Sequence, residues 1–457
     1  MPRSPLSSPY SYLYVKHFTK VSGDLTNLTF FGGAGEVGRN CMLVEEGRNN
    51  LLLDAGVKIG ETDEYPLLAS EDIRRLERIA ISHTHLDHVG YLPHMYAKGC
   101  RAEVYSTKPT RDLTQLLLSD YLRINRGMKF TNNDIIRAMK MWRMVEYGQV
   151  VGNRLKFSFH KSGHILGSAM VLVQGGTRLL FSSDINDKET KLLDAGERNL
   201  VAENLIIEST YGAPGEEHPS LKVASKMLCD SISETVKMGG TVLIPSFAVG
   251  RAQEILFILE SYMSSGVLEK VPIFVDGMIL KANRIYRQNV IYARDEIQKR
   301  ILMSDDDPFK SKFFHTPKTK DRSDVLKHGS AIIVSTSGML SGGPVLHYLN
   351  KLAGDRRNLL MLVGYQAEGT LGRKLLEGAK RITVDRREIE VNMRVQQAPF
   401  SAHADYKGLL DIVRSIKKLK RVFVIHGESK RPRELGDAIG RLGYDVVVPR
   451  NGESFRL

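Results

Sequence analysis

The chain has 457 residues, 42% of them hydrophobic and 26% charged, which fits two or three globular domains and excludes an intrinsically disordered protein. Lysine and arginine number 65 against 52 aspartates and glutamates, which gives a net charge of +13. This excess of positive charge favours a polyanionic partner, with nucleic acid first.

The beginning of the chain lacks periodicity. We expect residues 1–26 to form a tail or a short extension, and packing to begin with a strand at 27–31. Residues 33–38 then spell GxGxxG, which in dinucleotide-binding proteins leads directly into a helix. Here the segments 41–44 and 51–53 predict two strands around a turn instead. We therefore reject a dinucleotide site at these glycines.

The densest group of metal-binding side chains follows an apolar strand at 78–82. The next six residues are His83-Thr84-His85-Leu86-Asp87-His88. Three histidines and one aspartate exceed what one tetrahedral ion usually takes from a single loop, so the motif predicts two ions. A solvated polar turn is the alternative. Asp54, which ends the strand at 51–53, either caps the next turn or accepts a hydrogen bond from a ligand histidine.

Further strands also end in an imidazole or a carboxylate. Helices are expected at 92–98, 110–122 and 133–144, the last of which carries Trp142 as a packing residue. Strands are expected at 103–105, 155–160, 169–174, 178–181 and 204–207. His164 lies between two of them, and Asp184 and Glu208 follow two others. Such a repeated pattern is typical of loops gathered at one edge of a sheet.

From about residue 212 helices and strands alternate. Helices are expected at 221–238, 252–264 and 280–301, and strands at 241–245, 271–275, 331–334 and 359–363. This alternation predicts parallel βαβ units and a second α/β domain. The turns at 246–251 and 335–343 could present backbone amides to a phosphate, although Gly-Ser turns often have no such role. Nearer the C-terminus, His403 lies in SAHAD, and His426 follows an apolar strand at 422–425.

These motifs resemble a known family. The metallo-β-lactamase fold has motifs similar to HTHLDH, LLLDAG, SGHILGSA and the strand-terminal Asp184. The β-CASP branch of that fold, which processes nucleic acids, has three extra motifs, and these are similar to IESTYG, SAHAD and VIHGE. GYQAEGTLGR and SFAVGRAQE resemble archaeal homologues of the cleavage and polyadenylation specificity factor nuclease. The resemblance covers residues 27–457.

The resemblance implies an α/β fold, namely a metallo-β-lactamase αββα sandwich with an inserted β-CASP α/β domain. The expected boundaries are 27–208 for the first part of the lactamase-like domain, 209–395 for the β-CASP domain and 396–457 for the completion of the first domain. The few residues before the first strand suggest the short subgroup without KH domains.

The resemblance also assigns roles to residues. One Zn²⁺ would bind His83, His85 and His164, a second would bind Asp87, His88 and His426, and Asp184 would bridge the two. Asp54 would orient a ligand. Glu208 and His403 would position and donate a proton near the leaving group, so that the catalytic set is His403, Glu208, Asp87 and Asp184. For phosphate or RNA contacts we name Ser246, Arg251, Ser335, Ser337, Gly338 and Arg373.

The function implied is a zinc-dependent ribonuclease that hydrolyses phosphodiester bonds by a two-metal mechanism, in RNA 3′-end processing or RNA decay. A histidine at position 426 favours RNA over DNA, and SAHAD favours an endonuclease without excluding a 5′–3′ exonuclease. The alternatives are a DNA nuclease, a non-catalytic nucleic-acid-binding paralogue and a hydrolase of small esters.

The remaining expectations concern compartment and partners. Cys41, Cys100 and Cys229 form no CxxC pair, which argues for a reducing compartment, and no apolar run is long enough to span a membrane. We expect a cytoplasmic protein that binds single-stranded RNA and no membrane. Relatives suggest a homodimer and an RNA-processing or decay complex.

Overall fold

Two mixed sheets pack face to face in the first half of the fold. The computed structural model describes residues 25–457 except residues 61, 126, 305 and 385, so nearly all of the expected tail lies outside the described residues. The first sheet has the order β21 (Ser454–Arg456), β1 (Thr26–Gly32), β2 (Cys41–Glu46), β3 (Asn49–Leu53), β4 (Arg78–Ala80), β5 (Glu103–Ser106) and β6 (Trp142–Met144). The second has the order β20 (Asp445–Val447), β19 (Arg421–Ile425), β10 (Asn204–Glu208), β9 (Arg178–Phe181), β8 (Ala169–Gln174) and β7 (Lys156–Lys161).

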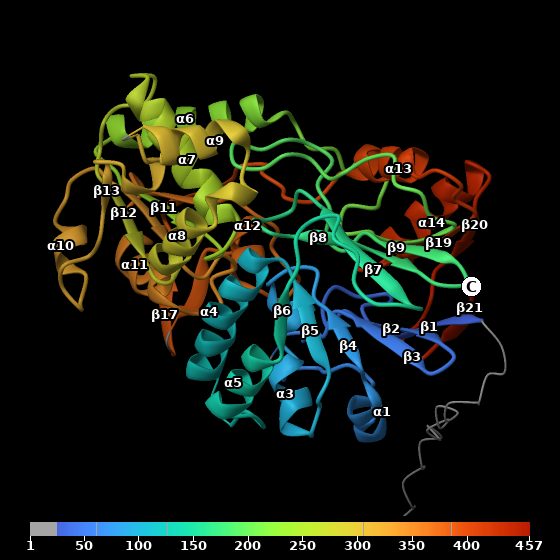
Figure 1. The fold of residues 1–457 in the computed structure, drawn as a ribbon. Coiled ribbons are helices and arrows are strands. Elements are labelled where there is room, and N and C mark those ends of the chain that lie inside the picture. The colour runs from blue at the N-terminus through green and yellow to red at the C-terminus, as the bar shows by residue number, and fades with distance from the viewer. Residues whose placement is uncertain (1–24, 61, 126, 305, 385) are drawn as a thin grey trace, which may run out of the picture.

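Helices cover the outer face of each of these sheets (Figure 1). The first sheet is covered by α1 (Ser70–Arg75), α3 (Leu92–Ala97), α4 (Lys108–Ile124) and α5 (Asn132–Lys140). The second is covered by α13 (Tyr406–Ser415) and α14 (Arg431–Arg441). The result is the four-layer αββα sandwich that the family resemblance implied.

Strand β8 is apolar along nearly its whole length because each of its faces meets a different core. In β8, Ala169, Val171 and Val173 point into the core between the two sheets, whereas Met170 and Leu172 point toward α13 and α14. Alternate side chains of a strand lie on opposite faces, so a strand buried on both sides carries no polar alternation.

A third sheet forms the core of the second lobe. Its six strands are all parallel, in the order β13 (Phe314–His315), β12 (Ile273–Asp276), β14 (Ile332–Ser335), β11 (Val242–Pro245), β15 (Leu359–Leu362) and β18 (Arg394–Gln397). One face packs on α6 (Leu221–Lys237) and α7 (Arg251–Ser264), and the other on α11 (Pro344–Leu352) and α12 (Leu371–Leu376). A hairpin of β16 (Arg381–Val384) and β17 (Arg387–Glu390) borders this second core.

The second lobe is inserted between two neighbouring strands of the second sheet. β10 and β19 pair in parallel, with Leu205 opposite Val422, although more than two hundred residues separate them in the sequence. The chain therefore leaves this sheet after β10, builds the third sheet, and returns as β19. Figure 1 shows the inserted lobe beside the sandwich, next to α4.

The helix expected at 133–144 ends earlier than predicted. α5 stops at Lys140, and Trp142 begins strand β6, where it pairs with Val104. The Trp142 indole N–H donates to Ser106 Oγ at 2.8 Å, and the side chain is buried. Burial of the indole and the pairing with β5 outweigh the helical pattern, although the packing role expected for Trp142 is correct.

The helix expected at 280–301 is divided into three parts, which are α8 (Ile279–Gln288), a 3₁₀ turn (Val290–Tyr292) and α9 (Asp295–Met303). Asn289 separates the first two, and its side-chain amide donates to Asp112 Oδ2 of α4 at 3.2 Å. A tertiary contact that the local sequence does not reveal thus interrupts this helix.

The hairpin of β2 and β3, which was predicted after GxGxxG, is confirmed. No helix of the described residues is long and apolar enough to cross a membrane.

Candidate active site

The candidate site lies where the carboxyl ends of several strands meet between the two sheets of the sandwich. Asp54 follows β3, the HTHLDH loop follows β4, Asp184 follows β9, Glu208 ends β10 and His426 follows β19. Strands β3 and β4 run parallel, as do β9, β10 and β19, so their carboxyl ends share one edge. The topology explains why residues far apart in the sequence converge here.

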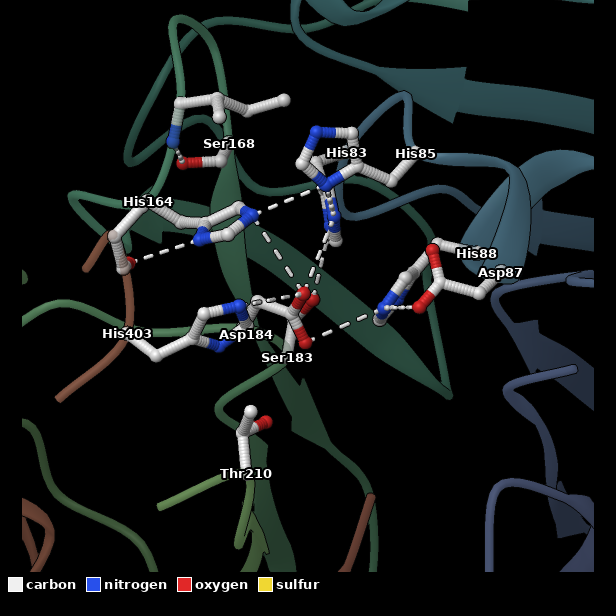
Figure 2. Close-up of polar contacts among 12 residues, drawn as sticks. His83, His85, Asp87, His88, His164, Ser168, Ser183, Asp184, Thr210 and His403 are labelled. Atoms are coloured by element: carbon white, nitrogen blue, oxygen red, sulfur yellow. Dashed lines mark hydrogen bonds and ion pairs between the residues drawn. The ribbon is translucent and has the colours of Figure 1, made fainter. Parts of the chain in front are cut away.

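A first group of side chains consists of His83, His85, His164 and Asp184 (Figure 2). His85 Nδ1 lies 3.1 Å from both His83 Nε2 and His164 Nε2. Asp184 Oδ2 lies 3.5 Å from His83 Nε2 and 3.6 Å from His164 Nε2. Three imidazole nitrogens and one carboxylate oxygen therefore surround a common point, which is the donor set that a tetrahedral zinc ion takes.

A second group consists of Asp87, His88, His426 and again Asp184. Asp87 Oδ2 lies 3.2 Å from His426 Nε2 and 3.6 Å from His88 Nε2. The other carboxylate oxygen of Asp184, Oδ1, lies 3.3 Å from His88 Nε2 and accepts no hydrogen bond from the described residues. Asp184 thus faces both groups, one oxygen to each, and an unbonded buried carboxylate oxygen suits a cation.

Hydrogen bonds on the side away from the two groups fix the orientation of two of the histidine rings. His88 Nδ1 donates to Asp54 Oδ2 at 2.7 Å, and Asp54 also accepts from Ser82 N and Ser82 Oγ at 2.8 Å each. His164 Nδ1 donates to the carbonyl oxygen of Ala402 at 2.9 Å. In both rings Nδ1 is the nitrogen that donates to an oxygen, so Nε2 carries the lone pair that a metal could accept.

Three non-glycine residues at the site adopt left-handed backbone conformations. The φ angles are 60° for Asp54, 51° for Ser183 and 49° for His426. Each residue lies at the first or second position after a strand. Such conformations are rare for residues with a Cβ atom and concentrate at functional sites. They redirect the chain sharply, so that the strand-terminal side chains point to the common edge.

Burial and charge set the protonation of the ligand groups. Burial and the nearby charge of His88 hold the pKa of His83 well below its usual value, which keeps this imidazole neutral as a metal ligand must be. Burial opposes ionisation of Asp184, but His88, His426 and His403 outweigh it and hold its pKa well below the usual range. An ionised carboxylate among neutral and cationic imidazoles is ready to exchange protons for a metal ion.

A third group links Asp184 to Glu208 and His403. His403 Nδ1 donates to both carboxylate oxygens of Glu208, at 2.9 and 3.0 Å, and His403 Nε2 lies 4.0 Å from Asp184 Oδ2. Glu208 also accepts from Ile185 N at 2.9 Å. Burial opposes protonation of His403, but Glu208 and Asp184 outweigh it and raise its pKa to about 9. His403 therefore presents a proton toward the metal-binding groups (Figure 2).

The expected phosphate contacts lie in different surroundings. Arg251 begins α7, makes no hydrogen bond or ion pair with the described residues, and lines a small recess with His164 and Ser401. Ser246 and Ser335 are buried at the ends of adjacent strands β11 and β14. Ser337 Oγ is used within its own turn, where it donates to Gly342 O, and Gly338 lies against Phe247. Arg373 is exposed on α12, where it pairs with Glu377 at 2.7 Å, and no contact joins it to the metal-binding groups.

Two residues near the site escaped the sequence analysis. Asn40 is fully buried, and its Nδ2 lies 3.2 Å from His88 Nε2. Phe247, between β11 and α7, places its ring 6.5 Å from the ring of His85. Neither residue belongs to a pattern of metal-binding side chains, and both approach the site only through the tertiary fold.

Comparisons with known proteins agree with this architecture. A metallo-beta-lactamase superfamily domain matches residues 43–207, a Beta-Casp domain matches residues 252–375, and a Zn-dependent metallo-hydrolase RNA specificity domain matches residues 388–449. The transcription termination factor FttA of Methanothermobacter thermautotrophicus is 35% identical over 96% of this chain and 73% of its own length. The chain belongs to the β-CASP family of the metallo-β-lactamase superfamily.

Other relatives extend this finding. The RNase J-like protein of Methanocaldococcus jannaschii is 39% identical to this β-CASP protein, over 93% of this chain and 98% of its own length. The crystal structure of a protein of unknown function from Enterococcus faecalis V583 has a TM-score of 0.58 at 13% identity, over 95% of this chain and 100% of that one. The latter likeness shows the fold alone. The family membership makes this protein a metal-dependent hydrolytic nuclease.

Proposed function

We propose that this protein is a zinc-dependent ribonuclease that cleaves single-stranded RNA at a two-metal site and acts in RNA 3′-end processing or RNA decay. The observation that carries the proposal is the position of the Glu208–His403 pair beside two groups of metal-binding side chains that share Asp184. The names of the relatives, a termination factor and an RNase J-like protein, support RNA as the substrate.

His83, His85 and His164 would hold one zinc ion, Asp87, His88 and His426 the second, with Asp184 as a ligand of both. Two divalent ions offset the negative charge of a phosphodiester and lower the pKa of an attacking water. The residues around them fix the geometry. Asp54 orients His88, and the carbonyl of Ala402 orients His164.

His403 would serve as the proton donor to the departing ribose oxygen. Glu208 accepts the Nδ1 hydrogen bond and thereby directs Nε2 toward the reacting phosphate. With its pKa raised to about 9, His403 is protonated at neutral pH, as an acid at this position must be. Arg251 lies next to His164 and Ser401 and, although the charge of Glu254 stabilises it, makes no direct ion pair with the described residues; it would bind the phosphate backbone.

We further propose that residues 27–208 and the C-terminal segment together form the catalytic lactamase-like domain, with the β-CASP domain from residue 209 as an insertion. Because β18 pairs with β15 of the third sheet, the second junction is better placed after Gln397 than at 395. A cytoplasmic location, a homodimer and an RNA-processing complex belong to the same proposal.

The cleavage mode is tested with RNA labelled separately at each end and carrying either a 5′-monophosphate or a 5′-triphosphate. We favour endonuclease action, which gives internal products that do not depend on the 5′ group. Progressive loss of nucleotides that requires a monophosphate would mean a 5′–3′ exonuclease. Absence of any RNA cleavage by zinc-loaded protein would refute the proposal.

The role of His403 is tested by His403→Ala. We expect RNA cleavage to fall by about a hundredfold or more while two zinc ions per chain are retained, because a lost general acid costs two to four orders of magnitude. His160→Ala is a matched control, since His160 also pairs with a glutamate, Glu197 at 3.1 Å, but outside the metal-binding groups. Loss of a zinc ion from the His403 variant would contradict this role.

A further inference from the structure

Phe247 is the one phenylalanine, tyrosine or tryptophan whose side chain is exposed in the part of the chain that the structure describes. It is 37% exposed, whereas the other exposed large hydrophobic side chains are aliphatic or methionine. Its neighbours in the loop between β11 and α7 are turned inward, because Ser246, Ala248 and Val249 are all buried. An exposed aromatic ring in an otherwise buried loop calls for a reason beyond packing.

The ring lies against two glycines in the loops that follow β14 and β15, the two strands on either side of β11 in the third sheet. A Cβ atom on Gly338 would lie 3.1 Å from Phe247 Cδ2, and one on Gly364 would lie 3.9 Å from Cε2. A side chain at position 338 would press against the ring, whereas a Cβ atom at position 364 would only touch it. The backbone at Gly338 therefore packs closely against one side of the ring.

The supported ring is directed at the metal-binding groups. Its centroid lies 6.5 Å from that of His85, at an interplanar angle of 45°. Arg251, the first residue of α7, follows four positions later and borders His164. The loop thus brings an exposed aromatic ring and a guanidinium to two neighbouring ligands of the proposed metal site.

We propose that Phe247 is a stacking platform for the base of a nucleotide next to the scissile phosphate, and that it makes cleavage depend on an unpaired nucleotide there. Every base has a π face, and stacking on an aromatic side chain contributes about 1–3 kcal/mol per base. A base within an A-form duplex is stacked on its neighbours and cannot leave them without unpairing. This inference rests on the proposed RNA substrate and adds the residue that selects its single-stranded form.

The test compares Phe247→Leu, which removes the ring, with Phe247→Trp, which keeps an aromatic face. On single-stranded RNA we expect the leucine variant to lose about 5- to 100-fold in kcat/KM, the loss that corresponds to one stacked base. We expect the tryptophan variant to stay within a few-fold of wild type. Val267→Ala is the control, because this exposed residue lies beyond the far end of α7, a 14-residue helix about 20 Å long.

A second set of substrates removes the base in place of the ring. Each RNA carries a single abasic ribose on one side or the other of the mapped cleavage site. On one of these substrates the kcat/KM of the wild type should fall by about the same factor as the kcat/KM of Phe247→Leu falls on intact RNA. The kcat/KM of Phe247→Leu should not fall further on that substrate, because the base and the ring act as one contact. Equal cleavage of intact RNA by wild type and Phe247→Leu would overturn the proposal. So would a loss in both Phe247 variants that accompanies a lower melting temperature, because that is a packing defect.

A binding measurement separates this inference from the proposed function. Single-stranded RNA that contains the fluorescent base 2-aminopurine is titrated with the full-length His403→Ala protein, with and without Phe247→Leu. Fluorescence quenching that requires Phe247 supports stacking even if the wild-type protein cleaves no RNA. RNA cleavage by wild type without Phe247-dependent quenching would leave the proposed function intact and refute the stacking role.

Discussion

Asp184 joins the three groups of functional side chains through its two carboxylate oxygens. Oδ1 faces His88 and His426, whereas Oδ2 faces His83, His164 and, at 4.0 Å, His403. A single carboxylate between the two proposed metal positions and the proposed proton donor fixes all three relative to one another. Small displacements of Asp184 would therefore disturb metal binding and proton transfer together.

At the residue scale, Asp54→Ala should weaken metal binding without removing a ligand. Asp54 fixes the ring of His88 through Nδ1, and loss of such a supporting carboxylate typically lowers metal affinity about 10- to 100-fold. Zinc affinity is measured by competition with a chelator. Asp134→Ala is the control, because this buried carboxylate caps α5 away from the site. Unchanged affinity in the Asp54 variant would contradict the supporting role.

His94 should make the protein less stable in acid. Its ring is buried among Tyr65, Tyr91 and Phe130, and neither nitrogen has a hydrogen-bond partner. Burial, with the charge of Lys98, lowers the pKa of His94 to about 4. The unfolded chain binds this proton near pH 6.5 and the folded protein only near 4, so stability falls as the pH falls through this window.

His94→Phe removes this titration and keeps an aromatic ring in an aromatic environment. The loss of unfolding free energy between pH 7.5 and pH 5, measured in urea, should shrink by about 2 kcal/mol relative to wild type. An equal loss in both proteins would mean that other groups account for the acid sensitivity.

At the scale of the elements, the sequence predicted the strands that position the site. It did not predict where the helices at 133–144 and 280–301 are interrupted. The strands before Asp54, Asp184, Glu208 and His426 are continuous apolar runs that end in a polar residue, a local signal that the sequence carries in full. The division of the helix at 280–301 depends on the contact of Asn289 with α4, and the end of α5 depends on burial of Trp142. Such features need the tertiary fold, as does the approach of Phe247 to His85.

The loop that begins α7 gives a prediction at the element scale. Gly250 has a φ of 89°, and a Cβ atom there would lie 2.5 Å from Ile165 Cγ2, in the apolar contact between the two lobes. Gly266, just beyond the end of α7, has a φ of 75° with open space around it. Both alanine variants lose unfolding free energy because alanine is strained in a left-handed backbone conformation, but only Gly250→Ala also creates a clash.

We therefore expect Gly250→Ala to lose about 1–3 kcal/mol more unfolding free energy than Gly266→Ala. It should also cleave RNA more slowly, because the loop carries Arg251 and Phe247. Equal effects of the two variants on stability and on cleavage would show that the contact between the lobes at Ile165 is not tight.

For the whole molecule, the insertion predicts that the sandwich folds without the second lobe. His218 N donates to Asp405 Oδ2 at 3.0 Å, so the two ends of the inserted segment lie close together. A protein in which residues 220–397 are replaced by a Gly/Ser linker of about ten residues should fold cooperatively, because so flexible a linker spans a short gap. It keeps all seven proposed zinc ligands.

We expect this shortened protein to bind two zinc ions per chain and to lose RNA cleavage, since the insertion supplies Arg251 and Phe247. Zinc analysis and thermal unfolding check the first point, and labelled RNA checks the second. An unfolded or zinc-free product would mean that the sandwich depends on the apolar contact with the inserted lobe.

The pairing of β10 with β19 also determines when the protein can become active during its synthesis. The six residues from His83 to Asp184 that contribute to the proposed zinc sites leave the ribosome early, whereas His403 and His426 are added more than two hundred residues later. At about 5–20 residues per second, translation from Glu208 to His426 takes on the order of 10–40 seconds. Until this interval ends the nascent chain lacks His426, the last proposed ligand of the second zinc ion, and strand β19, which positions His426. If the protein is the proposed two-metal ribonuclease, an incomplete chain is unable to cut the messenger RNA from which it is being made.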